Sequence, residues 1–128
     1  MATLHRADRN SLLAKIHIRK RELGLADPEY RGLLRAWFGV DSSADLTMPQ
    51  MAMLLGHMED LAWVASSPCG EQKKRVAVRW ALSGRNRRSL DSMVRSLFGI
   101  SRLEWLADER DVRFIMRRIG GYENQADR

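Results

Sequence analysis

The sequence has very little cysteine and proline and no long apolar run. Its 128 residues include one cysteine, Cys69, and 3 prolines. A single cysteine excludes an internal disulfide and indicates a reducing compartment. No apolar run approaches the ~20 residues of a membrane-spanning helix, and the opening MATLHRADRN lacks the apolar core of a signal peptide. We therefore expect neither export nor insertion into a membrane.

Metal-ligand and catalytic patterns are also missing. The histidines His5, His17 and His57 have no partner at the spacing of a zinc site. No glycine-rich phosphate loop follows a strand, and Cys69 has no neighbouring base that would activate its thiol. We therefore expect no enzyme activity, no metal site and no cofactor.

The apolar residues are spaced for helices in the first half of the chain. A first helix over residues ~10–23 ends at Gly24. Asp27, followed by a proline, starts a second helix that Gly39 ends. Thr47 caps a third.

The second half follows the same plan. A helix over residues ~72–83 ends at Gly84, and the next ends at Gly99. The last starts at Asp108 and ends at the glycine pair 120–121. No segment alternates with period two, so no sheet is expected.

The two halves echo each other at a constant offset. LLRAWFGV, residues 33–40, returns as MVRSLFGI, residues 93–100. The apolar positions of residues 15–55 and 75–115 also coincide without a gap, which chance rarely produces. We predict an all-α fold of two tandem three-helix, helix-turn-helix-like repeats related by an offset of about 60 residues.

The same pattern sets the predicted domains. Residues 10–64 form the first repeat, and residues 65–72, ASSPCGEQ, form a linker rich in serine, proline and glycine. Residues 73–121 form the second, basic repeat, and residues 122–128 form a flexible tail. The sequence leaves open whether the repeats pack into one body or move about the linker.

The positive charge is confined to the second half of the chain. The net charge is +6, yet residues 1–64 hold 8 basic and 8 acidic residues. A run of basic residues at 73–95 contains a single acid, Asp91. Arginine dominates the run, which favours phosphate contacts over a merely solvated face, although that alternative stays open. The candidate nucleic-acid-binding residues are Lys73, Lys74, Arg79, Arg85, Arg87 and Arg88.

A standard major-groove reader is less favoured by the sequence. In the usual helix-turn-helix, a small residue four positions before the turn glycine lets the two helices cross closely. Here that position holds Trp80 before Gly84 and Lys20 before Gly24.

Four tryptophans divide into two pairs. Trp37 lies on an apolar stripe, and both it and Trp80 are predicted to be core residues. Trp63 and Trp105 either form the contact between the repeats or are exposed anchors for a partner protein. Methionines 48, 51, 53 and 58 gather on the third helix, where they fill the core or line an adaptable groove.

Two stretches resemble a known family. AKIHIRKRELGLADPEYRGLLRAWFGV, residues 14–40, is similar to the N-terminal signature of GemA-type regulatory proteins of Mu-like phages and prophages. The matching positions are His17, Lys20, Leu23, Gly24, Tyr30, Arg31 and Leu34. The RSLFGISRLEWL stretch, residues 95–106, also resembles that family, whereas the methionine-rich third helix departs from it.

The resemblance implies a small phage protein that modulates host gene expression in the bacterial cytoplasm. It implies no enzymatic activity and supplies no set of functional residues. Our first hypothesis is a regulator that contacts DNA through the second repeat. The alternative is an adaptor that binds a host protein through an apolar or aromatic helical surface.

Overall fold

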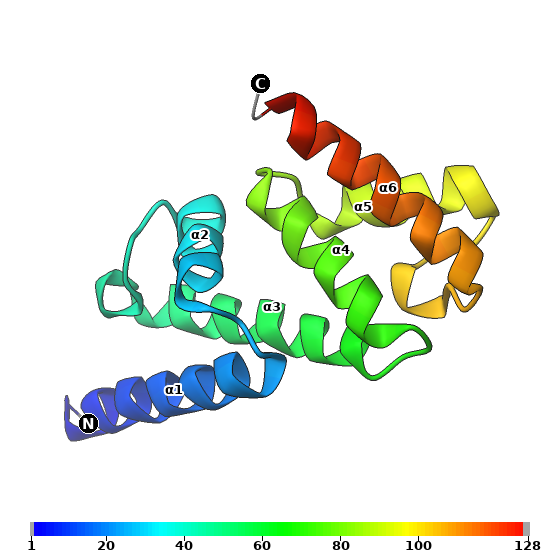
Figure 1. Ribbon diagram of the computed structural model, residues 1–128. Helices are drawn as coiled ribbons and strands as arrows, with labels where there is room; N and C mark the ends of the chain where they lie inside the picture. Colours follow the sequence, from blue (N-terminus) through cyan, green and yellow to red (C-terminus); the bar gives the residue numbers. More distant parts are fainter. Residues whose placement is uncertain (1, 127–128) are drawn as a thin grey trace. The chain divides into compact units, whose positions relative to one another are not determined.

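A computed structural model describes residues 2–126 of the chain and the side chains of residues 8–119. All the regular structure in this described part is helical, so the predicted all-α class is confirmed (Figure 1). The elements are α1 (Ala2–Leu23), α2 (Asp27–Phe38), the short 3-10 helix η1 (Ser43–Asp45), α3 (Met48–Ala65), α4 (Gly70–Leu82), α5 (Arg87–Phe98), the 3-10 helix η2 (Leu103–Trp105) and α6 (Glu109–Ala126).

The chain divides into two compact units, Met1–Ala62 and Trp63–Arg128. This boundary falls near the end of α3, just before the predicted linker at 65–72. The last part of that linker is helical, because α4 begins at Gly70.

The helix bounds of the two units correspond closely. Helix α5 begins and ends at the positions that the sequence offset assigns to the two ends of α2, and η2 corresponds to η1 in the same way. Gly39 and Gly99 end α2 and α5 in the left-handed conformation, each with a φ of 70°, which glycine adopts without strain. The tandem repeat itself stays a prediction.

Most helices begin where the capping residues in the sequence predict. Thr47 and Gln50 form a capping box at α3, where Gln50 N donates to Thr47 Oγ1 (3.3 Å) and Thr47 N donates to Gln50 Oε1 (2.9 Å). Asp108 caps α6 by accepting a hydrogen bond from Arg110 N at 2.9 Å. At α2 the cap is Ala26 rather than the predicted Asp27, and its N–H donates to Glu29 Oε1 at 3.1 Å.

Two predicted helix ends differ from the structure. Helix α1 begins at Ala2 rather than near residue 10, because no proline or glycine interrupts ATLHRADRN. Helix α6 continues through the glycine pair 120–121 to Ala126, so the prediction that it ends there is wrong. The side chains of the predicted tail, residues 122–128, lie outside the described residues, as does His5.

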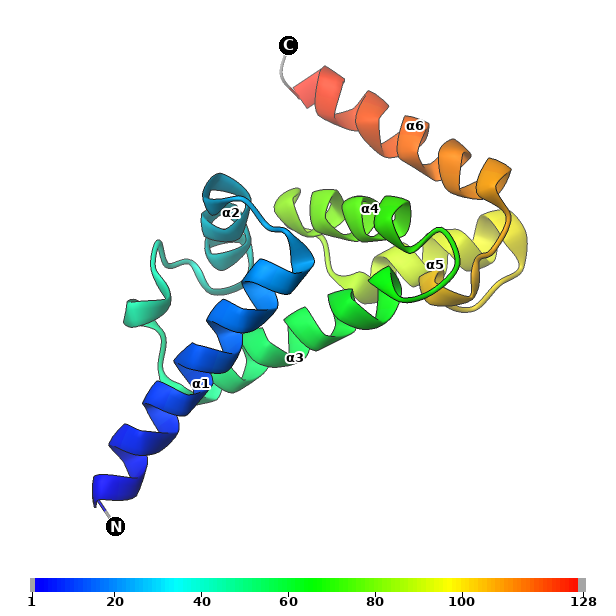
Figure 2. The same cartoon turned by 60° about the horizontal axis from the view of Figure 1, so that its bottom comes forward.

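The first unit is held together by α1, α2 and α3, and Figure 2 shows α1 running close to α3. Arg19 on α1 forms an ion pair with Glu59 on α3, with Nε 2.7 Å from Oε1. His57 on α3 stacks on Trp37 of α2, with ring centroids 4.5 Å apart. The fully buried side chains are Ile16, Leu33, Leu34, Leu46, Met51, Leu54 and Met58.

The second unit is built around α4, which contacts α5, α6 and η2 (Figure 1). Phe98 of α5 meets Phe114 of α6 edge to face, with ring centroids 6.2 Å apart. The fully buried side chains include Leu90, Val94, Leu103, Leu106 and Ile115. The core of this unit therefore depends on every one of its helical elements.

A cation holds the short 3-10 helix of each unit. In the first unit, Arg9 donates to the carbonyl oxygens of Ala44 (2.7 Å) and Leu46 (2.8 Å). In the second unit, Lys73 donates to the carbonyl oxygens of Glu104 (3.0 Å) and Leu106 (2.8 Å). The acceptor residues 44 and 46 of the first unit correspond to residues 104 and 106 of the second at the offset of 60 residues. The donors Arg9 and Lys73 are not related by this offset, so each unit supplies its cation from a different helix position.

None of the helices is both long and apolar enough to cross a membrane, within the residues that the structure describes.

Candidate nucleic-acid interface

Lys73 lies in the interior and does not reach solvent. Its side chain is fully buried, and both of its hydrogen bonds go to backbone carbonyls in and after η2. Burial away from water lowers the pKa of the ammonium, while the nearby Cys69 and Glu104 act to raise it. The prediction that Lys73 contacts a phosphate is therefore corrected: it positions η2 instead.

Lys74 and Arg87 are also largely withdrawn from the surface. Lys74 is buried and pairs with Glu71 at 2.8 Å. Arg87 donates to Asp91 Oδ1 at 3.2 Å and to Glu104 Oε2 at 2.8 Å, and its side chain is 21% exposed. These internal pairings make both residues poor candidates for phosphate contact, contrary to the sequence-based prediction.

The acidic side chains of α5 and η2 interact with other groups of the second unit. Asp91 accepts from the backbone N–H of Leu103 at 2.9 Å as well as from Arg87. Glu104 is buried, and its Oε1 lies 3.0 Å from Arg102 Nε in an ion pair without hydrogen-bond geometry. Asp91 is the only acid between residues 72 and 103, and just outside this stretch Glu71 interacts with Arg75.

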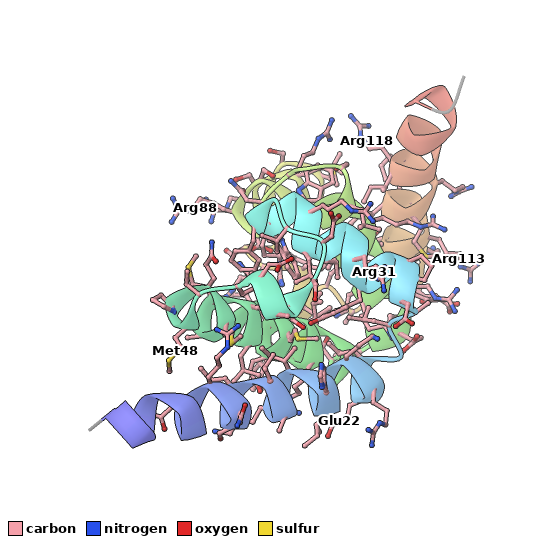
Figure 3. All side chains as sticks on the ribbon, turned by 90° about the vertical axis from the view of Figure 1, so that its left-hand side faces the viewer. Glu22, Arg31, Met48, Arg88, Arg113 and Arg118 are labelled. Atoms are coloured by element: carbon pink, nitrogen blue, oxygen red, sulfur yellow. The ribbon has the colours of Figure 1, made fainter. Side chains whose placement is uncertain are left out.

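Three predicted residues do face solvent: Arg79, Arg85 and Arg88. Figure 3 shows Arg88 projecting away from the ribbon. Arg85 places its guanidinium over the Trp80 ring, 4.7 Å from the centroid. This contact holds Arg85 at the turn between α4 and α5 while leaving it exposed.

Trp80 fixes the turn that carries these arginines. It is buried, as predicted, and its indole N–H lies 2.9 Å from both Asn86 O and Ser89 Oγ. Asn86 caps α5 by accepting from Ser89 N at 2.9 Å. The bulk of Trp80 argued against a close crossing of α4 and α5, and in the structure Trp80 forms hydrogen bonds to the turn between these helices.

The structure adds two arginines that our set of candidates omitted. Arg75 is exposed one turn before Arg79 on α4, and Arg95 is exposed two turns after Arg88 on α5. The signal was available in the sequence, since each follows the helical spacing of a predicted residue. The exposed arginines of α4, the turn and α5 are Arg75, Arg79, Arg85, Arg88 and Arg95, and we call them the arginine surface.

Several cations of the first unit are paired with acids. Arg19 pairs with Glu22 as well as Glu59, and Arg35 pairs with Asp41 at 2.8 Å. Lys20 pairs with Asp27 and thereby lowers the pKa of that carboxyl. The neutral balance seen in the sequence is therefore present locally as ion pairs.

An open pocket of about 500 Å³ lies along the end of α1 and is lined by His17, Lys20, Arg21 and Leu25. Lys20 and Arg21 stand in the last turn of the helix, where cations complement the helix dipole. Their position therefore has a local structural explanation.

Both candidate partner-binding tryptophans are exposed. Trp63 is 66% exposed and Trp105 is 61% exposed. Arg102 lies 6.0 Å from the Trp105 ring centroid. Of the methionines on α3, Met51 and Met58 are buried and fill the core, whereas Met53 is exposed. Trp37, predicted to be core, is only partly buried.

No group of three or more possible metal ligands occurs among the residues that the structure describes. His57 is engaged with Trp37 and Phe38, with ring centroids 4.5 and 6.2 Å away. This stacking accounts for its place on α3 without a metal.

The fold and the surface together define a small all-α protein of two compact units, with most of the exposed arginines on the second. A family model described as the bacteriophage Mu GemA protein matches residues 25–120. The chain therefore belongs to the GemA family, which indicates a phage protein. No curated protein and no solved structure matches the chain.

The family match confirms the resemblance seen in the sequence. Tyr30, Arg31 and Leu34 of the first motif lie inside the matched region, as does the whole stretch at 95–106. His17 and Lys20 precede it.

Proposed function

We propose that this chain is a non-enzymatic phage regulator that modulates host gene expression in the bacterial cytoplasm and contacts DNA through the arginine surface of its second unit. The observation that carries the proposal is the exposure to solvent of five arginines on α4, the following turn and α5. The acids of α5 and η2, Asp91 and Glu104, are bound within the second unit and do not cover these arginines. Duplex DNA offers the dense row of phosphates that such a surface binds.

The proposal has a quantitative consequence for salt. Five phosphate contacts would release about five counterions, so log K falls against log salt with a slope of roughly −4.5. Removing one contact makes that slope shallower by about 0.9. Lys73, Lys74 and Arg87 are outside this set because they are buried or paired.

The direct test is fluorescence anisotropy with a short labelled duplex across a salt series. Arg79→Ala and Arg88→Ala together should weaken binding at low salt and make the slope shallower by roughly 1.8. Lys15→Ala, at an exposed position of the neutral unit, is the control and should leave both unchanged. Binding that does not respond to salt would contradict the proposal.

The second candidate function is an adaptor for a host protein. It is favoured by one observation, the exposure of Trp63 and Trp105, since large aromatic side chains are typical anchors in protein interfaces. A pull-down from host lysate that survives nuclease treatment and is lost in Trp105→Ala would support it. Retention of DNA binding by that variant would separate the two functions.

We also propose that the two units are repeats with different roles. The support lies in the matched bounds of α2 with α5 and η1 with η2, and in the equivalent carbonyls at 44, 46, 104 and 106 that receive a cation. Only the second unit carries the net charge. The first unit then serves a structural or protein-binding role.

A further inference from the structure

We propose that α5 enters the major groove of duplex DNA with one particular face, formed by Arg88, Ser92, Arg95 and Ser96. This inference rests on the DNA contact proposed above and specifies how that contact is made. The four residues are spaced i, i+4, i+7 and i+8, so they lie along one side of the helix, and all four are exposed. We call them the α5 face.

The α5 face is cationic and free of acids. Asp91, the only carboxylate on α5, is 19% exposed and is held inward by Arg87 and by the backbone N–H of Leu103. Arg88 and Arg95 form no ion pair within the described part of the chain. A helix that must approach two rows of phosphates requires this absence of negative charge.

Two of the four residues of the α5 face are small. Ser92 and Ser96 each offer a hydroxyl that both donates and accepts hydrogen bonds. A helix with its side chains is about 10–12 Å across, close to the ~12 Å width of the major groove. Small residues on this face let the backbone approach the base edges, where a serine hydroxyl can bond to several bases.

The remaining arginines suit a supporting role. Arg79 is exposed on α4, and Arg85 is held over Trp80 at the turn that leads into α5. In helix-turn-helix proteins the second helix lies in the groove while the preceding helix crosses the backbone. Arg79 and Arg85 would then bind phosphates beside the groove that the α5 face occupies.

The first unit provides a natural comparison, because the sequence offset assigns each residue of α5 a counterpart on α2. The positions equivalent to the α5 face are Pro28, Gly32, Arg35 and Ala36. Three of these are uncharged, and Arg35 is bound to Asp41 at 2.8 Å. The position equivalent to Asp41 in the second unit is Ser101, so Arg95 has no such partner. The arginine at this helix position is therefore paired with an acid in the first unit, as Arg35, but not within the described residues of the second, as Arg95.

The groove contact can be tested separately from the phosphate contact. Two duplexes of identical sequence are compared by anisotropy at one salt concentration, one of them carrying glucosylated 5-hydroxymethylcytosine. The glucose fills the major groove but leaves every phosphate in place. We expect the full chain to bind the glucosylated duplex at least about tenfold more weakly, as for the loss of one good base contact.

A pair of variants tests the α5 face itself. Ser96→Gln adds neutral bulk and should weaken binding to the unmodified duplex about tenfold while leaving the salt slope unchanged. Ala36→Gln, at the equivalent exposed position of α2, is the control and should bind as the wild type does. Circular dichroism establishes that both variants are folded.

The outcomes distinguish the two proposals. Equal binding to both duplexes with a steep salt slope would overturn groove entry and leave the phosphate contact standing. Binding to neither duplex at low salt would overturn the DNA function and the groove entry together. Weaker binding to the glucosylated duplex, combined with the effect of Ser96→Gln, supports both.

Discussion

The Lys73 ammonium nitrogen lies 2.8 Å from the carbonyl oxygen of Leu106 inside the second unit. A fully buried lysine is costly unless its charge is satisfied, and here two carbonyl oxygens share that task. The interaction anchors the segment that leads into α6. Lys73 belongs to the run of basic residues that the sequence predicts to bind DNA, yet in the structure it stabilises the fold.

Replacing Lys73 should destabilise the protein without altering DNA binding by the folded form. Lys73→Met keeps the length of the side chain but leaves the carbonyls of Glu104 and Leu106 without their donor. We expect a loss of about 1–3 kcal/mol in the free energy of unfolding, measured by urea denaturation. Arg75→Met, at an exposed position of the same helix, should change it by less than about 0.5 kcal/mol. Equal effects of the two substitutions would contradict the role of Lys73.

His57 should make the stability of the first unit depend on pH. Burial against Trp37 lowers the pKa of His57 from its usual 6.5, and Asp60 opposes this only partly. Between the lowered pKa and 6.5, the unfolded chain binds more protons than the folded one, so the free energy of unfolding falls as the pH falls.

The measurement compares wild type with His57→Gln by chemical denaturation at pH 7.5 and pH 5. The stability advantage of the wild type over this variant should shrink at the lower pH. A constant difference at the two pH values would show that His57 does not titrate as its surroundings require.

Gly70 should tolerate no side chain. A Cβ atom at this position would lie 1.9 Å from the carbonyl oxygen of Ala65, which belongs to the backbone and has little freedom to move. Gly70→Ala should therefore cost about 1–3 kcal/mol in the free energy of unfolding. The control is Gly56→Ala in the interior of α3, where the added Cβ meets open space and should stabilise the helix by about 0.5–1 kcal/mol. Both variants are compared with the wild type by thermal denaturation, and an unchanged melting temperature for Gly70→Ala would be the contrary result.

The helices were predictable from the sequence because their signals are local. Gly39 and Gly99 end α2 and α5, and Thr47 and Asp108 cap the following helices as their residue types predict. The start of α1 was not predicted correctly. The sequence before residue 10 contains neither proline nor glycine, so it has no local signal that marks where the helix begins.

The candidate site was only partly predictable, since charge alone does not say which way a side chain points. Lys73 lies one turn before Ala77 and two turns before Trp80, on the buried stripe of α4, and this spacing was visible in the sequence. Its acceptors on Glu104 and Leu106 were not visible, because they are distant in the chain. Arg87 and Arg88 differ by one position, and that rotation of about 100° sends one inward and the other to solvent.

We propose that the exposed arginines of the second unit, rather than positive charge in general, bind DNA. Two double variants that remove the same charge from different units should therefore bind DNA differently. Arg88→Ala with Arg95→Ala removes two exposed arginines of α5, whereas Arg31→Ala with Arg35→Ala removes two exposed arginines of α2. Both double variants lower the net charge by the same amount.

The most direct measurement is the anisotropy of a labelled duplex with these two double variants and the wild type, across one salt series. We expect a slope near −4.5 for the wild type and the α2 variant, and a slope near −2.7 with weaker binding for the α5 variant. Equal slopes for the two double variants would contradict this expectation and show that the arginines of the second unit have no special role.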